Sequence, residues 1–450
     1  MRQRRRPRAL LAAAVLGALF APVSMACRSM GSYVQADHFA EAGRYDEAAV
    51  TLDEQKALLY HQSTDVILYE LDQGLLAHYG GRYRESIELL ASGEEHIEEA
   101  YTQSAARLTA SAIVNDNSKN YDGEDYEDLY INVFNALNYY HEGNVDDAIV
   151  EIRHMNEKLN YLETKYSVVK RKMANINEYD APSSAEWYIS KFANSALSRY
   201  LGVLFYRAGG RGDDARIDYE GLAAAYRNAP ELYRFPIPSS LKDDMTIPKE
   251  KARLNVLAFS GLAPVKRERV TWVPLGSDMN PMKIALPEMV SRHSFIDAID
   301  LVLEDGTTVN LELLEDIDAV ARETFRSKVG AITRKTVLRS ILKNTAAVAT
   351  RDVGGAMSQS SNDRTAAAGS LMMALGVLGQ IAANASEQAD LRMGRYFPGK
   401  AFVGGLTLEP GTYSFTVRFL GGGRVLHAVE YHDVEVSAGG LNLVEAVCLR

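Results

Sequence analysis

The chain has 450 residues, of which 47% are hydrophobic and 24% are charged. This composition excludes an intrinsically disordered protein, and a total of two cysteines excludes a scaffold held together by disulfides. The net charge is −10, and residues 27–160 contain 26 Asp and Glu against 9 Lys and Arg. We expect no nucleic-acid partner, because phosphates require basic side chains.

The first 26 residues have the three parts of a secretion signal. Arginines between residues 2 and 8 precede an uncharged apolar stretch over residues 9–20, and small residues then lead to Cys27. The segment resembles a bacterial lipoprotein signal, which implies cleavage before Cys27 and a diacylglycerol on its thiol. An ordinary signal peptide cleaved near Ala26 is the alternative. Because Asp does not follow Cys27, we expect an exported protein anchored to the outer membrane and facing the periplasm.

A helix, glycine turn, helix pattern recurs from Tyr33 onward, with turns at Gly43, Gly81, Gly143 and about residue 210. Glycine supplies the positive φ of a tight reversal, and acidic residues after it favour the start of the next helix. Each helix pair has an apolar face that a neighbouring pair can cover, so the pairs are expected to stack. The fourth turn follows a helix predicted over residues 187–208.

These pairs resemble the tetratricopeptide repeat, although their spacing departs from its regular period. The run over residues 117–156 also resembles a family of poorly characterised bacterial envelope lipoproteins with such helices and a carboxyl-terminal β-rich region. The resemblance implies a helical repeat domain over residues 27–235 and no established activity. The repeat turn and packing positions are Gly43, Tyr45, Ala48, Gly74, Gly81, Tyr83, Ser86, Gly143 and Ala148.

The second half alternates with the two-residue period of strands, after four prolines between residues 230 and 248. Its turns include Asp305-Gly306, a pair that favours a tight hairpin. We expect an α+β protein whose β-sandwich is built from residues 236–316 and 388–450, around a helical insertion over residues 317–387. Two separate β units are the alternative. The strands are predicted at residues 254–259, 269–273, 282–286, 299–303, 309–313, 401–408, 413–420, 425–430, 434–436 and 441–447.

The insertion contains no charged residue between Arg364 and Glu387. Gly369, Gly376 and Gly379 suit close packing against another helix. We expect a buried or oligomer-forming helix here, and a bilayer span is the alternative because the length is sufficient.

Catalytic and metal-binding patterns are missing from the sequence. The nine histidines include no His-Glu-x-x-His pair, and the acidic loop over residues 116–125 resembles a calcium loop but has Leu129 where the closing glutamate belongs. We therefore expect no enzymatic activity, no cofactor and no metal. Cys448 is expected to pack as a small buried side chain.

Aromatic side chains give a further signal in the repeats. Tyr126, Tyr130, Tyr139 and Tyr140 could line a peptide-binding groove or fill helix-packing positions. The sequence as a whole favours a lipid-anchored, non-enzymatic scaffold that binds unidentified proteins through its repeats. One alternative is an oligomeric component of an envelope assembly or secretion machine, in which the insertion mediates self-association or membrane contact. The other is glycan or ligand binding by the β region.

Overall fold

The computed structural model describes residues 33–60, 64–106, 120–174, 188, 190–274 and 281–450. Helices and strands are both abundant, so the expected α+β class is confirmed. Cys27 and the secretion signal lie outside the described residues.

Helical hairpins occupy the amino-terminal half. They are α3 (Val34–Glu41) with α4 (Tyr45–Glu54), α6 (Val66–Tyr79) with α7 (Tyr83–Ala106), α8 (Asp125–His141) with α9 (Val145–Ala174), and α10 (Ala196–Ala208) with α11 (Gly212–Asn228). Two short helices, α5 (Lys56–Leu59) and α12 (Leu241–Met245), accompany them.

The predicted turn glycines have the left-handed backbone that the reversals require. The φ angles are 75° at Gly43, 75° at Gly81, 80° at Gly143 and 68° at Gly210. Residues with a Cβ rarely adopt this conformation. The predicted turn positions are therefore confirmed.

Small residues allow the helices of a hairpin to approach closely. A Cβ added at Gly74 would lie 2.7 Å from Leu90 Cδ2, and Ser86 Oγ donates a hydrogen bond to the Gly74 carbonyl oxygen at 2.7 Å. Ala48 and Ala148 are fully buried at the corresponding positions of other hairpins. The repeated small residues thus lie in the interfaces between paired helices.

Two four-stranded sheets form the second half. The first has the order β10-β1-β7-β6, from β10 (Asn442–Cys448), β1 (Ala252–Leu262), β7 (Pro398–Leu408) and β6 (Glu312–Asp316). The second has the order β5-β4-β8-β9, from β5 (Thr308–Asn310), β4 (Ala298–Leu303), β8 (Gly411–Gly421) and β9 (Arg424–Val436). Strands from before and after the insertion share each sheet, so separate β units are excluded. A two-stranded hairpin, β2 (Val265–Val273) and β3 (Met282–Val290), lies apart from both.

One predicted strand is divided between the two sheets: its first part, in β5, pairs with β4 as the expected hairpin, with Leu301 opposite Val309. Residues 309–313 were expected to complete a hairpin around Asp305-Gly306, and Gly306 does have a φ of 86°. However, β5 ends at Asn310, and β6 joins the other sheet. Leu311 remains bonded to the β4 backbone through its N–H, so the chain changes sheets immediately after this residue.

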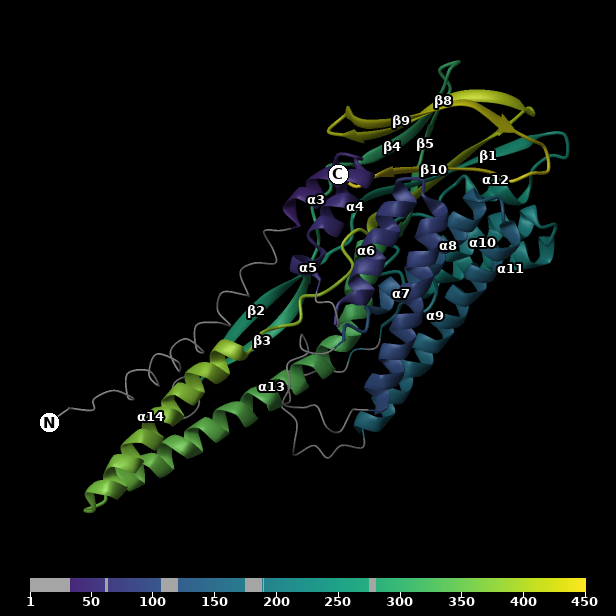
Figure 1. The fold of residues 1–450 in the computed structure, drawn as a ribbon. Coiled ribbons are helices and arrows are strands. Elements are labelled where there is room, and N and C mark those ends of the chain that lie inside the picture. Colours follow the sequence, from purple (N-terminus) through teal and green to yellow (C-terminus); the bar gives the residue numbers. More distant parts are fainter. Residues whose placement is uncertain (1–32, 61–63, 107–119, 175–187, 189, 275–280) are drawn as a thin grey trace.

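The first sheet is the middle of three layers, with helices on one face and the second sheet on the other (Figure 1). Every residue of β1 is buried. Leu257 and Phe259 pack with the helices, whereas Leu254, Val256 and Ala258 pack with the second sheet. Cys448 is also buried in the core between the sheets, as expected. The helical and β regions therefore share one packed body.

A long helical arm projects from this body (Figure 1), made of α13 (Ile317–Ser358) and α14 (Asp363–Ser386). A Cβ at Gly369 would overlap the α13 backbone, and one at Gly376 would lie 2.5 Å from the Arg351 nitrogen. These glycines therefore permit the expected close packing. The first alternative of that expectation, a buried helix, is wrong, because only 17% of the most apolar 18-residue stretch of α14 is buried. Self-association of this helix stays a prediction. Within the described residues, α14 alone is long and apolar enough to cross a bilayer by length and composition.

Candidate functional site

The candidate groove tyrosines do not line an open groove. Tyr126 and Tyr130 are completely buried, where Tyr126 packs edge-on against Phe397 and Tyr130 bonds to Glu315. Tyr140 is half-buried, and its hydroxyl exchanges hydrogen bonds with the backbone of Leu443 at 3.0 Å. Tyr139 is half-buried and packs against the helical core. The groove interpretation is corrected to helix packing, because these rings face the interior of the layered body.

The repeat residues form part of the seam between the helices and the first sheet. The residue three positions before each turn glycine is Ala40, His78, Tyr140 or Arg207. Ala40 is buried, and the other three bond to groups on β1, on β10 or in α12. One repeat position thus supplies contacts to the sheet from successive hairpins. Sequence reasoning identified the repeats but missed this shared position.

A buried glutamate on β10 connects two of the hairpins. Glu445 accepts from His78 Nε2 at 2.7 Å and from His141 Nε2 at 2.9 Å, and its side chain is 5% exposed. His78 Nδ1 lies 2.7 Å from Asn138 Oδ1, while Tyr83 stacks on the His141 ring at 4.3 Å. Only the tertiary fold brings the two histidines to one carboxylate, so no local sequence signal indicates this cluster.

The titration of this cluster follows from its charges. Burial raises the pKa of Glu445, but attraction and hydrogen bonds from the two histidines outweigh burial and lower the pKa to about 2. Burial lowers the pKa of His78, but the attraction to Glu445 and the hydrogen bonds with Glu445 and Asn138 together outweigh burial, so the net direction of the pKa is upward. The cluster is therefore a buried ion pair that anchors helices to the sheet.

A second anchor lies at Glu315 on β6. Its carboxylate accepts hydrogen bonds from Tyr130, from Ser195 Oγ at 2.8 Å, from Leu197 N at 3.0 Å and from Tyr233 Oη at 2.9 Å. Burial raises the pKa of Glu315, and these hydrogen bonds oppose that shift. Since Leu197 lies in the first turn of α10, Glu315 fixes the start of this helix on the sheet.

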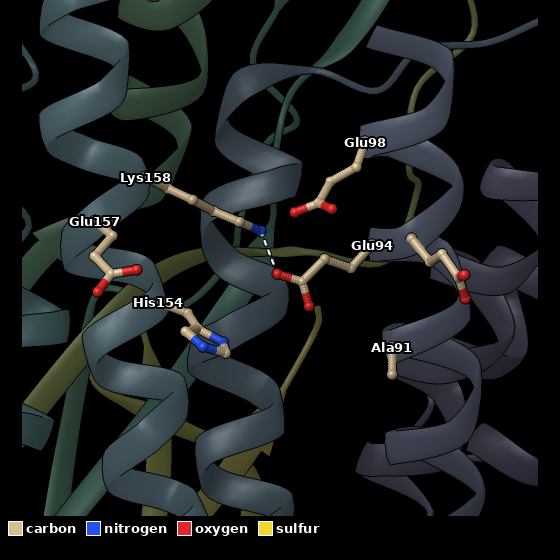
Figure 2. Close-up of a pocket in the computed structure, with 7 residues that line it drawn as sticks. Ala91, Glu94, Glu98, His154, Glu157 and Lys158 are labelled. Carbon is tan, nitrogen blue, oxygen red and sulfur yellow. Dashed lines mark ion pairs between the residues drawn. The ribbon is translucent and has the colours of Figure 1, made fainter. Parts of the chain in front are cut away.

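An acidic groove of about 380 Å³ lies open to solvent between α7 and α9 in the helical layer. Figure 2 shows the carboxylates of Glu94 and Glu98 extending from α7 toward Lys158 on α9. Glu95, Glu98, His154 and Glu157 are solvent-exposed. The full lining is Ala91, Glu94, Glu95, Glu98, His154, Glu157 and Lys158.

Lys158 is held at the base of this acidic groove. Its ammonium lies 2.6 Å from Glu94 Oε1 and 2.6 Å from Asp128 Oδ1. Burial lowers the pKa of Lys158, but attraction to Asp128 and Glu94 reverses the direction. The groove therefore combines a fixed internal cation with a rim of carboxylates, an arrangement that attracts cations and basic segments.

The groove lining contains no Ser, Thr or Cys side chain that could act as the nucleophile of acyl transfer. In the part of the chain that the structure describes, no group of three or more His, Cys, Asp or Glu side chains could hold a metal ion. No family model matches the chain, and searches of curated proteins and solved structures found no similar protein.

Proposed function

We propose that the protein is a lipid-anchored, non-enzymatic scaffold of the bacterial envelope, and that its acidic groove binds a basic segment of a partner protein. The observation that carries this proposal is the groove itself. Its rim carboxylates Glu95, Glu98 and Glu157 are solvent-exposed, whereas the carboxylate cluster at Glu445 is buried in the seam with the first sheet. A partner can therefore reach the groove without opening the fold.

We also infer that the helical hairpins are divergent tetratricopeptide-like units and that the two sheets form a β-sandwich. The four positive-φ glycines and the contact between Gly74 and Ser86 support the first inference. The apolar core shared by the two sheets supports the second. Both inferences agree with the signal segment, since an exported scaffold needs a rigid frame and an accessible surface.

The proposal is tested by photocrosslinking in cells. A photoreactive phenylalanine at Ala91, which lies exposed in the groove, should crosslink to a discrete partner. The same probe at Val50, which is 57% exposed on α4, serves as the matched control. Crosslinking from Ala91 should fall about tenfold in the Glu95→Lys, Glu157→Lys variant, because a reversed rim charge repels a basic segment.

The charge control is Glu54→Lys, since Glu54 is exposed on α4 outside the groove. This variant should crosslink from Ala91 as strongly as the parent protein. Equal adducts from Ala91 and Val50, or adducts unchanged by reversal of the groove charges, would reject the proposed site.

A further inference from the structure

The outward sides of α14 are apolar along most of its length. Leu371, Leu375 and Leu378 are 62%, 51% and 39% exposed on one flank. Met373, Val377 and Ile381 are 42%, 36% and 53% exposed on the neighbouring flank. The remaining side of the helix packs on α13 through Gly369 and Gly376. A helix that is apolar over most of its circumference requires an apolar environment beyond one neighbouring helix.

The charge of the arm indicates which environment fits. The arm, residues 317–386, contains nine Lys and Arg and four Asp and Glu. No acidic residue lies between Glu323 and Asp352 on α13, and exposed Leu338, Ile341 and Leu342 lie among its basic residues. Apolar and basic side chains on one element are typical of contacts with anionic lipid surfaces. A second copy of the chain would bring two positively charged arms together.

An exposed tryptophan lies next to the base of the arm. Trp272 on β2 is 54% exposed and pairs with Lys283 on β3. Asn384 near the end of α14 accepts a hydrogen bond from Lys283 N at 3.1 Å and donates one to the Pro281 carbonyl at 3.0 Å. Tryptophan is enriched where protein surfaces meet the headgroup region of a bilayer. The base of the arm therefore carries a third feature of an interfacial surface.

The arm is suited to lie in the bilayer surface and not to cross it. Arg351 on α13 faces Gly376 at the middle of α14, and the neighbouring Asp352 side chain is 60% exposed. Each such charge is strongly unfavourable at the centre of a bilayer. An orientation in the interface leaves these charges in water while α14 enters the acyl chains.

We propose that the arm binds the surface of an anionic phospholipid bilayer, with α14 buried in the boundary between headgroups and acyl chains. The partly exposed Lys335 on α13 and the exposed Arg364 at the start of α14 lie at headgroup level. Three other basic residues of α13 pair with carboxylates of this chain, namely Lys328, Arg339 and Lys343. This contact adds to the lipid at Cys27 and does not depend on the acidic groove. The partner of the helical insertion in this proposal is a lipid surface and not another protein.

The test uses the mature chain with Cys27→Ser, so that no covalent lipid contributes. This protein should float with vesicles of phosphatidylglycerol and phosphatidylethanolamine, and flotation should fall at least about fivefold on pure phosphatidylcholine. The Leu375→Glu, Leu378→Glu variant should lose flotation to a similar extent, because it places charges among acyl chains. Val425→Glu is the matched control, since Val425 is 49% exposed on β9, and it should float normally.

A site-directed probe keeps the proposal testable if the glutamate variant folds poorly. An environment-sensitive fluorophore on Leu375→Cys should brighten and shift to the blue with anionic vesicles, whereas the same fluorophore on Val425→Cys should not change. Cys448 is 4% exposed and reacts little with the label. The proposal is overturned if the fluorophore at position 375 is already blue-shifted without lipid and the measured mass is a multiple of the monomer mass. It is also overturned if neither flotation nor fluorescence responds to vesicles. Groove variants should float like the parent, which separates this result from failure of the proposed scaffold function.

Discussion

At the scale of single residues, the buried Glu445 carboxylate is a negative charge at the interface between the helical layer and the first sheet. It reaches His78 on α6 and His141 on α8 from one carboxylate on β10. The two histidines are separated from Glu445 by about three hundred residues or more along the chain. Both hydrogen bonds of this carboxylate can form only when the two helical hairpins are packed against the sheet.

Glu445→Gln should lower the free energy of unfolding by about 2–3 kcal/mol near pH 6, because the variant leaves buried His78 without its anionic partner. Urea unfolding followed by circular dichroism measures the change. Glu435→Gln, at an exposed position on β9, is the control and should shift the free energy by less than about 0.5 kcal/mol. If both substitutions change the free energy of unfolding equally, the cluster at Glu445 does not stabilise the fold in the way proposed.

The stability difference should depend on pH with a defined sign. The lowered pKa of Glu445 gives stability that is present above its ordinary value of 4.5 and is lost as pH falls toward about 2. The raised pKa of His78 gives stability that is present below 6.5 and is lost as pH rises through the folded-state value. The gap between parent and Glu445→Gln should therefore be widest between about pH 4.5 and 6.5 and should narrow by pH 9. A gap that grows steadily toward pH 9 contradicts this assignment.

At the scale of elements, two adjacent glycines of α13 differ in their surroundings, since Gly354 lies against α14 and Gly355 faces open space. A Cβ at Gly354 would overlap the backbone nitrogen of Met373 on α14, whereas a Cβ at Gly355 would have nothing within 4 Å. The same glycine-to-alanine substitution should therefore have opposite effects at neighbouring positions of α13.

Gly354→Ala should destabilise the paired helices by about 1–3 kcal/mol through overpacking. Gly355→Ala should be neutral or stabilise α13 by up to about 1 kcal/mol, because alanine favours helix. Hydrogen exchange measured by mass spectrometry over residues 340–386 reports the difference. Faster exchange in Gly354→Ala, with protection unchanged or increased in Gly355→Ala, is expected. Similar exchange in the two variants would show that close packing at Gly354 does not hold the arm together.

Local signals explain how much of this architecture the sequence could predict. The turn glycines, the strand periodicity and the uncharged stretch each act within a short window, and the turns, most strands and both arm helices occur where they were expected. The start of α10 was predicted too early. Ser195 caps this helix by accepting from Ser198 N at 3.1 Å, and Glu315 from a distant strand holds its first turn. The division between β5 and β6, the parallel pairing of β1 with β10 and the cluster at Glu445 likewise depend on contacts far apart in sequence.

At the scale of the whole molecule, the segment after α14 couples the arm to the helical layer. Arg392 bonds to Asp65 at 2.9 Å, Gly394 N donates to Glu127 Oε1 at 2.6 Å, and Arg395 pairs with Asp37 at the start of the first hairpin. The arm base, the sheet and the repeats are thereby joined through one stretch of chain. A bilayer-bound arm would consequently fix the direction in which the acidic groove faces.

The predicted lipid anchor and the proposed bilayer contact of the arm should make separable contributions to membrane attachment. Cys27→Ser should accumulate as unprocessed precursor or be released from the membrane, because the predicted diacylglycerol is lost.

Membrane fractions washed at low and high salt distinguish the contact made by the lipid from the contact made by the arm. Some of the released variant should remain bound at low salt through the basic arm and leave at high salt, since salt screens attraction to anionic headgroups. The parent should resist both washes, and Cys448→Ser, at a buried position, should fractionate like the parent. Normal maturation of Cys27→Ser with parental resistance to high salt contradicts anchoring at Cys27.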